Sequence, residues 1–307
     1  MKKLYILLFS IIFFNLTFFS HSYEKKIITT IKPLHSILLN IVDTDVDLLL
    51  DSNFSPHDFK LKPSDMIKLN DADVLIYIDE SIETFIERPL ASIKNDVKTI
   101  KILGNVNLSL LPIREGGVWE EEDHGDGHHH DHGDYDGHVW LSNENVIKMT
   151  KFLIKELSKI NPDKKNIYKA NAKIFIKKLK DNSKKVKKEL VSVKNKPFIV
   201  FHDAYQYFEN ENPLNSVGSI SLNPEISPTP KRIQEIKSKI KKDNVVCLFR
   251  EPQFPSRIVQ TIIQDTNAKE GELDPIGFDL TPGKELYFTL INNLSNNLKE
   301  CLMKEGS

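Results

Sequence analysis

The sequence predicts an α/β protein with two small, mainly parallel sheets covered by helices. Short apolar runs such as DVLIYID, at 73–79, alternate with helical patterns in the first part of the chain. The same alternation resumes with PFIVF at 197–201, and residues 143–195 between them are helical in pattern. Apolar strands that alternate with helices are typical of parallel sheets buried on both faces. We therefore expect two α/β units separated by a helical region.

Residues 1–22 have the features of a secretory signal peptide. Lys2 and Lys3 precede an apolar run at 4–19, and small residues follow at Ser20 and Ser22. This order of basic, apolar and small residues marks a segment that is removed on export. The apolar run is short for a membrane span. We expect cleavage near Ser22 and a soluble mature chain, and a retained N-terminal anchor is the alternative.

The first unit is expected at 23–142. Its predicted elements are a strand from 25 followed by a helix from 33, a strand at 46–53, a loop and short helix at 55–72, a strand at 73–79, a helix at 82–90 and a strand at 97–103. A His/Asp-rich loop at 115–137 interrupts this series, and HVWLS at 138–142 closes it.

The helical region at 143–195 is expected to hold two helices. Its first helix has apolar residues at helical spacing, namely Val146, Met149, Phe152, Leu153 and Leu157. Asn161 and Pro162 then end this helix and start a second one that continues to about residue 193. About thirty helical residues span roughly 45 Å, which is enough to bridge two domains. Its many lysines are read as a solvated face, with nucleic-acid or membrane contact as the alternative.

The second unit is expected at 196–307. Its predicted elements are a strand from 197, a helix at 231–242, a strand and loop at 245–254, a helix at 255–264 and a last helix at 283–304. Its two cysteines, Cys247 and Cys301, are the only ones in the chain. In an exported protein an even pair indicates one disulfide, and two buried free thiols are the alternative. The net charge of -1 argues against nucleic acid as a partner.

Six of the ten histidines lie between His124 and His138, in a stretch with eight carboxylates and no lysine or arginine. Imidazole is a common zinc ligand, and a His-rich tract is a compositional sign of metal binding. Glycines in the tract disfavour regular structure. We expect an accessory metal-binding loop, and a solvated acidic loop with incidental histidines is the alternative. Its proposed ligands are His124, His128, His129, His130 and His132.

Three histidines lie at the edges of predicted strands or loops. They are His57 in SPHDFKLKPSD, His138 in DGHVWLS and His202 in PFIVFHDAYQYF. A selective zinc site needs about three or four ligands held by separate rigid elements. Spacing alone does not bring these three together, and each taken singly could be a structural histidine.

The ordered set of motifs resembles the solute-binding proteins of bacterial zinc-uptake ABC transporters, within a wider group that binds zinc, manganese or iron. The set comprises IKPLHSI, SPHDFKLKPSD, the acidic His loop, DGHVWLS, FHDAYQYF, SLNPEISPTP, EPQF and LDPIG, and it extends from Ile27 to the last helix. The resemblance implies two α/β lobes joined by one long rigid helix, with Zn2+ between them. It also implies that His57, His138 and His202 are the ligands.

The fourth ligand is left open between Asp274 and water. Asp274 in LDPIG matches the position where manganese- and iron-binding relatives supply a carboxylate, but it could instead cap its own loop. Three imidazoles favour zinc over manganese. The resemblance also matches Cys247 and Cys301 to a disulfide of some zinc-binding members. Asp203 and Glu251 are candidates to orient the ligand imidazoles, as is Asp58.

The resemblance implies a monomeric periplasmic receptor that captures zinc and delivers it to the membrane permease of a zinc ABC transporter, without catalysis. Three alternatives stay open. A manganese or iron receptor, or an adhesin, would share the fold. A zinc hydrolase also uses three protein ligands, although the chain has no HExxH motif. A passive zinc buffer would rely on the histidine loop alone.

Overall fold

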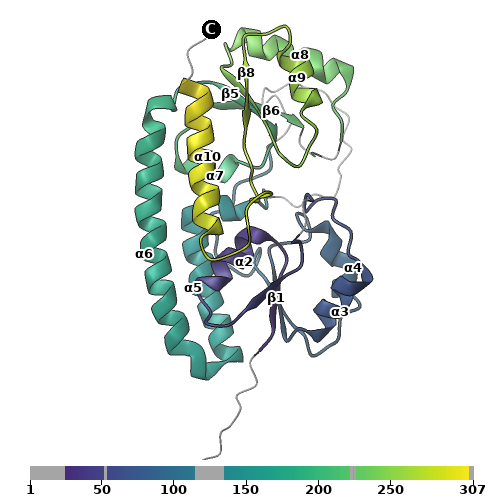
Figure 1. Ribbon diagram of the computed structural model, residues 1–307, viewed down its shortest axis with the longest axis vertical. Helices are drawn as coiled ribbons and strands as arrows, with labels where there is room; N and C mark the ends of the chain where they lie inside the picture. Colours follow the sequence, from purple (N-terminus) through teal and green to yellow (C-terminus); the bar gives the residue numbers. More distant parts are fainter. Residues whose placement is uncertain (1–24, 52–53, 115–134, 222–223, 225, 304–307) are drawn as a thin grey trace, which may run out of the picture.

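The computed structural model describes residues 25–51, 54–114, 135–221, 224 and 226–303. The predicted signal peptide at 1–22 and the five accessory histidines of the loop lie outside these residues. The described chain forms two lobes, each built on a four-stranded parallel sheet, with helices along one side of both (Figure 1). The predicted fold class is confirmed.

The N-terminal lobe contains the sheet β2-β1-β3-β4, in which every neighbouring pair is parallel. Its elements are β1 (Ile27–Thr29), α2 (Lys32–Leu39), β2 (Val46–Leu48), α3 (Pro63–Asp71), β3 (Val74–Tyr77), the 3-10 turn η1 (Thr84–Ile86), α4 (Glu87–Leu90) and β4 (Lys98–Lys101). All residues of β1 and β3 are buried. This complete burial explains why the two central strands, IIT and VLIY, are mostly apolar.

The C-terminal lobe contains the sheet β6-β5-β7-β8, which is also parallel. Its elements are β5 (Phe198–His202), α7 (Gln206–Glu211), β6 (Ser216–Ser221), α8 (Pro230–Lys242), β7 (Cys247–Arg250), α9 (Arg257–Ile263) and β8 (Lys269–Glu272). The edge strands β6 and β8 have the sequences SVGSIS and KEGE, which lack an apolar run. The sequence pattern did not identify these two strands.

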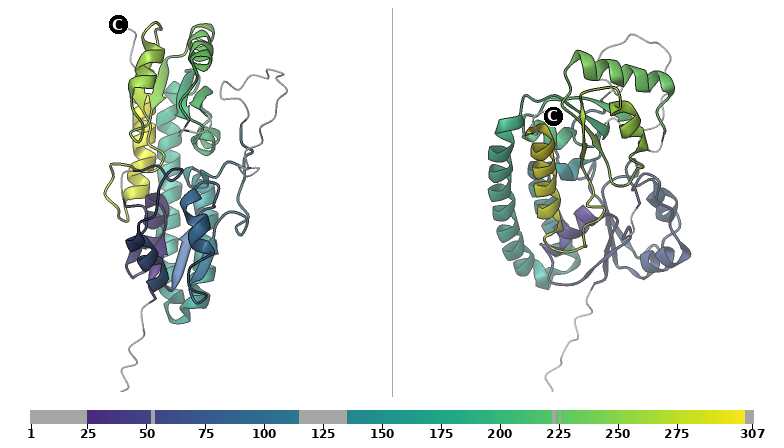
Figure 2. Two further views of the ribbon diagram at one scale, coloured as in Figure 1. Left: turned by 90° about the vertical axis from the view of Figure 1, so that its right-hand side faces the viewer. Right: turned by 45° about the horizontal axis from the view of Figure 1, so that its top comes forward.

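Three helices join the lobes: α5 (Asn143–Ile160), α6 (Lys165–Leu190) and α10 (Leu286–Met303). Helix α6 extends along both lobes, and α10 packs beside it (Figure 2). The 26 residues of α6 give a length of about 39 Å. The 3-10 turns η3 (Pro162–Lys164) and η4 (Val191–Val193) flank it, so the predicted helix from 162 to 193 is confirmed with 3-10 ends. Within the described residues, no helix is long and apolar enough to span a bilayer.

One apolar core runs through both lobes. It includes Ile28 of β1, Phe175 of α6, Phe198 of β5 and Leu294 of α10. A second, smaller cluster lies between the C-terminal sheet and helices α8 and α9. Because the interior is close-packed, a shared core holds the two lobes in one fixed arrangement.

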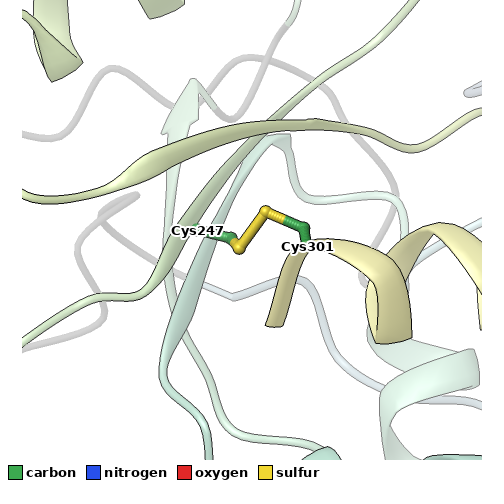
Figure 3. Close-up of a disulfide and its surroundings, with 2 residues drawn as sticks. All are labelled: Cys247 and Cys301. Atoms are coloured by element: carbon green, nitrogen blue, oxygen red, sulfur yellow. A yellow bond between two sulfur atoms is a disulfide. The ribbon is translucent and has the colours of Figure 1, made fainter. Parts of the chain in front are cut away.

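A disulfide ties the last helix to the C-terminal sheet. Cys247 begins β7 and Cys301 lies near the end of α10, with their Cα atoms 6.3 Å apart (Figure 3). Both residues are buried. The link that the even cysteine count indicated is therefore present in the structure.

Candidate metal centre

The three histidines at predicted strand and loop edges meet between the lobes. His57 lies in a turn between β2 and α3, His138 directly precedes the 3-10 turn η2 (Val139–Leu141), and His202 ends β5. One ring nitrogen from each lies within 4.8 Å of the others. Among the described residues this is the only such group of possible metal ligands. The structure thus brings together residues that are far apart in the sequence.

His202 is fixed by the C-terminal sheet. It is 4% exposed, and its Nδ1 lies 2.6 Å from Oε1 of Glu251, which follows β7. Because β5 and β7 are parallel neighbours, their carboxyl ends place the two side chains together. A carboxylate only accepts hydrogen bonds, so Nδ1 carries the proton and Nε2 carries the lone pair.

His138 is oriented by Asp136 in the same manner. Oδ1 of Asp136 accepts from Nδ1 of His138 at 2.7 Å and from its backbone N–H at 2.9 Å. The ring of Trp140 lies with its centroid 5.3 Å from that of His138, and its indole N–H donates to the Pro275 carbonyl. Asp136 was not among the residues that we expected to orient a ligand. The spacing Asp-x-His in DGH was the available signal.

The geometry of the two oriented rings fits zinc. Nε2 of His202 and Nε2 of His138 lie 3.3 Å apart, and both carry lone pairs when the two imidazoles are neutral. Two lone pairs at this distance repel each other unless a metal ion or a proton lies between them. Ligand nitrogens about 2.0–2.1 Å from a tetrahedral zinc lie roughly 3.3 Å from each other. The donor set of three imidazoles also suits zinc better than harder cations such as manganese.

Glu251 affects the basicity of the site. Burial lowers the pKa of His202, but the charge and hydrogen bond of Glu251, together with the charges of Asp203 and Asp136, outweigh it, so the pKa of His202 is raised. A more basic imidazole is a stronger metal ligand, although it also competes more strongly for protons.

Asp274 caps its own loop. Its carboxylate accepts hydrogen bonds from the backbone N–H groups of Ile276, Gly277 and Phe278. Burial raises its pKa to about 6, and these N–H groups partly oppose that shift. Asp274 is not part of the group formed by the three histidines. Its role as a fourth ligand therefore stays a prediction, beside the loop-capping role that the sequence also allowed.

Two other expected partners of the ligands are placed differently. Asp203 pairs with Arg114 at 3.3 Å, and Arg114 also contacts Glu209. Asp58 is exposed. Burial raises the pKa of Asp203 to about 7, and the charge of Arg114 opposes this. Asp203 thus links the second lobe to the chain segment before the histidine loop.

Comparison with known proteins agrees with this site. The family model described as zinc-uptake complex component A, periplasmic, matches residues 27–301. The high-affinity zinc uptake system protein ZnuA of Brucella suis is 38% identical, over 92% of both chains. Its Yersinia pestis counterpart is 32% identical, over 91% of this chain and 92% of its own.

Solved structures show the same fold. The Zn(II)-bound ZnuA-like domain of Streptococcus pneumoniae AdcA aligns with a TM-score of 0.70 and 25% identity, over 92% of this chain and 100% of its own. The matched family model and the identities above cover almost all of the described chain. This protein belongs to the ZnuA family of periplasmic zinc-uptake components.

Proposed function

We propose that this protein captures zinc in the periplasm and delivers it to the permease of an ABC transporter. One observation carries the proposal: Nε2 of His138 and Nε2 of His202 face each other at 3.3 Å, with both Nδ1 atoms held by carboxylates. His57 supplies the third ring nitrogen from the N-terminal lobe. The names of its relatives, high-affinity zinc uptake system proteins, support the same cargo.

The residues would bind zinc as neutral imidazoles. Asp136 and Glu251 hold the protons on Nδ1, which leaves Nε2 of His138 and His202 ready to coordinate. A water would complete the tetrahedron, because the Asp274 carboxylate already accepts three backbone hydrogen bonds. Three nitrogen ligands make manganese or iron the less favoured cargo.

We propose a receptor rather than a zinc hydrolase. The carboxylates beside the ligands, Asp136 and Glu251, are engaged with imidazole nitrogens, and Asp274 caps a loop. A hydrolase needs a general base within reach of a zinc-bound water. Each of these three carboxylates already accepts hydrogen bonds that hold a ring or a loop in place.

Competition titration with a zinc-selective chelator tests the site. His138→Ala should weaken zinc binding strongly, because it removes one of three protein ligands. His35→Gln is the matched control, since His35 is buried in the same lobe but bonds to the Val46 carbonyl away from the site. Equal affinity of His138→Ala and the parent would refute the site.

We also propose, from composition, that the histidines at 124–132 are an accessory zinc reservoir. Glycine has the largest backbone entropy to lose, so metal binding by a glycine-rich sequence is expected to be weak. Deleting residues 120–134 should remove weak zinc binding in isothermal titration and spare the tight phase. Loss of the tight phase would mean that the loop supplies primary ligands.

Three further proposals follow from the sequence and the family. Residues 1–22 are a cleaved signal peptide, the mature protein is a monomer, and the units are 23–142, 143–195 and 196–307. Mass spectrometry of exported protein tests the first, and sedimentation the second. Limited proteolysis tests the third.

A further inference from the structure

The segment at 79–86, here called the support segment, contains no metal ligand but contacts two ligand-bearing segments. It connects β3 to α4 through the 3-10 turn η1. Its two neighbours are the turn that carries His57 and the residues directly before His138. This places one piece of chain between the two ligands of the N-terminal lobe.

The support segment holds the His57 turn by its backbone and by a ring. The hydroxyl of Thr84 donates to the backbone carbonyl of His57 at 2.9 Å. Phe85 packs edge-on against Phe59, with ring centroids 5.0 Å apart. Both rings are buried. Because His57 lies outside any helix or strand, these contacts take the place of a sheet or helix in fixing it.

The same segment packs against the residue before His138. A Cβ atom at Gly137 would lie 2.2 Å from Cγ1 of Ile82, so only glycine fits there. Gly137 lies between Asp136 and His138, and the carboxylate of Asp136 orients the imidazole of His138. Ile82 is buried. A shift of the support segment would therefore move His138 as well as His57.

Glu83 anchors the support segment to the sheet. Its side chain is fully buried and accepts hydrogen bonds from the Thr30 hydroxyl and from the backbone N–H groups of Ile78 and Asp79. Thr30 follows β1, and the other two follow β3, so Glu83 joins the carboxyl ends of adjacent strands. A buried carboxyl group is costly unless it is fully hydrogen-bonded, and such networks make a local structure rigid.

We infer that Thr84 and Glu83 are positioning residues that set the separation of His57 and His138 and thereby the zinc affinity. The inference rests on the proposed zinc site. Neither side chain touches the metal ligands' ring nitrogens; Thr84 acts through the His57 backbone and Glu83 through the whole support segment. Residues that orient metal ligands in this indirect way typically change metal affinity by about 10–100-fold when they are replaced.

The first test removes one hydroxyl. Thr84→Val should release zinc faster and lower its affinity by about 10-fold, and Thr84→Ser should restore the parental value. Thr289→Val is the matched control, because Thr289 is also exposed and its hydroxyl also donates to a backbone carbonyl, that of Glu285, which is not one of the three histidines. Zinc dissociation is measured by stopped-flow with a chelator in excess. Parental kinetics of Thr84→Val would overturn the inference.

The second test examines Glu83, which anchors the support segment to the sheet. Glu83→Gln keeps the shape and an oxygen that can accept from both backbone N–H groups, and its amide NH2 can donate to the Thr30 hydroxyl, so it should retain zinc affinity. Glu83→Ala should lose at least as much affinity as Thr84→Val. Thr29→Val is the control: Thr29 is equally buried on β1, and the bond that it loses is to the Ile76 carbonyl of β3 and not to the support segment. If Glu83→Ala does not fold, Thr84→Val decides alone.

Visible spectra of the cobalt-substituted proteins provide a readout that stability does not affect. Thr84→Val should change the d–d bands, since these report ligand geometry, and Thr289→Val should not. Unchanged bands in Thr84→Val would contradict the inference. Failure of the parent to bind zinc or cobalt would instead refute the proposed function, so the two failures are distinguishable.

Discussion

The two lobes hold their ligands by different means. The C-terminal lobe presents His202 from the last residue of a strand and fixes it with Glu251 from the next strand. The N-terminal lobe presents His57, which is half-buried, from a turn that depends on contacts with the support segment. The comparison indicates that the second lobe presents its proposed ligand directly from a sheet strand, whereas the first lobe presents His57 through contacts between two loops.

The largest expected effect is on the stability of the protein and comes from the disulfide of the C-terminal lobe. Replacing Cys247 and Cys301 with serine removes a disulfide between residues 54 positions apart in the sequence. This loss should lower the free energy of unfolding by about 4 kcal/mol in the chain-entropy model. Zinc affinity at room temperature should change little, because the disulfide lies away from the ligands. Chemical denaturation and zinc titration of the double variant check both statements. A large loss of affinity would show that the sheet presenting His202 depends on this link.

The next effect compares ligands from the two lobes. His202→Ala should lower zinc affinity by more than about 100-fold, beyond the usual cost of losing a residue that only orients a ligand. His57→Ala should lower it less, because a half-buried turn lets water replace the imidazole. Competition titration of both variants measures the difference. If His57→Ala is the more damaging change, the N-terminal lobe is the more rigid partner and the comparison is wrong.

A smaller effect is expected for the carboxylate that orients His202. Glu251→Gln keeps a hydrogen-bond acceptor but removes the charge, so zinc affinity should fall by about 10-fold. Asp136→Asn makes the matching change at His138. Both variants should keep one tight site in the titration. Unchanged affinity in both would mean that the charges do not strengthen the imidazoles.

The smallest effect is a shift in pH dependence. Protons compete with zinc for neutral imidazoles, and Glu251 raises the pKa of His202 above its usual value of 6.5. As the pH is lowered, zinc affinity should therefore begin to fall at a higher pH than an unperturbed histidine would give, and Glu251→Gln should move this fall to lower pH. Titrations from pH 8 to 5 on protein lacking residues 120–134 exclude the accessory histidines. A curve that stays flat to pH 5 would indicate carboxylate ligands instead.

The central strands of both sheets were readable from the sequence, and two edge strands were not. Burial on both faces gives β3 and β5 continuous apolar runs. Strands β6 and β8 lie at the edges of their sheet and are only partly buried, so polar and glycine residues are tolerated there. Their strand structure comes from pairing with β5 and β7, which no local pattern records.

The proposed ligands and the carboxylate that orients His202, Glu251, were predicted from motifs in the sequence, but the other contacts around them were not. Spacing could not show that His57, His138 and His202 meet, because the fold brings them together over long sequence separations. Asp136 was detectable two residues before His138. The contact of Thr84 with the His57 carbonyl was not, since it joins residues 27 positions apart through a backbone atom that every residue has.

A crystal structure of the zinc-loaded mature protein, with anomalous data on both sides of the zinc absorption edge, tests the central claim most directly. The account predicts one strong zinc peak between the lobes, at about 2.0–2.1 Å from Nε2 of His138 and Nε2 of His202 and from a ring nitrogen of His57. The Asp274 carboxylate should still cap its loop, with water as the fourth ligand. A zinc peak that lacks any of the three histidines, or one held by Asp274 in place of His57, would contradict it.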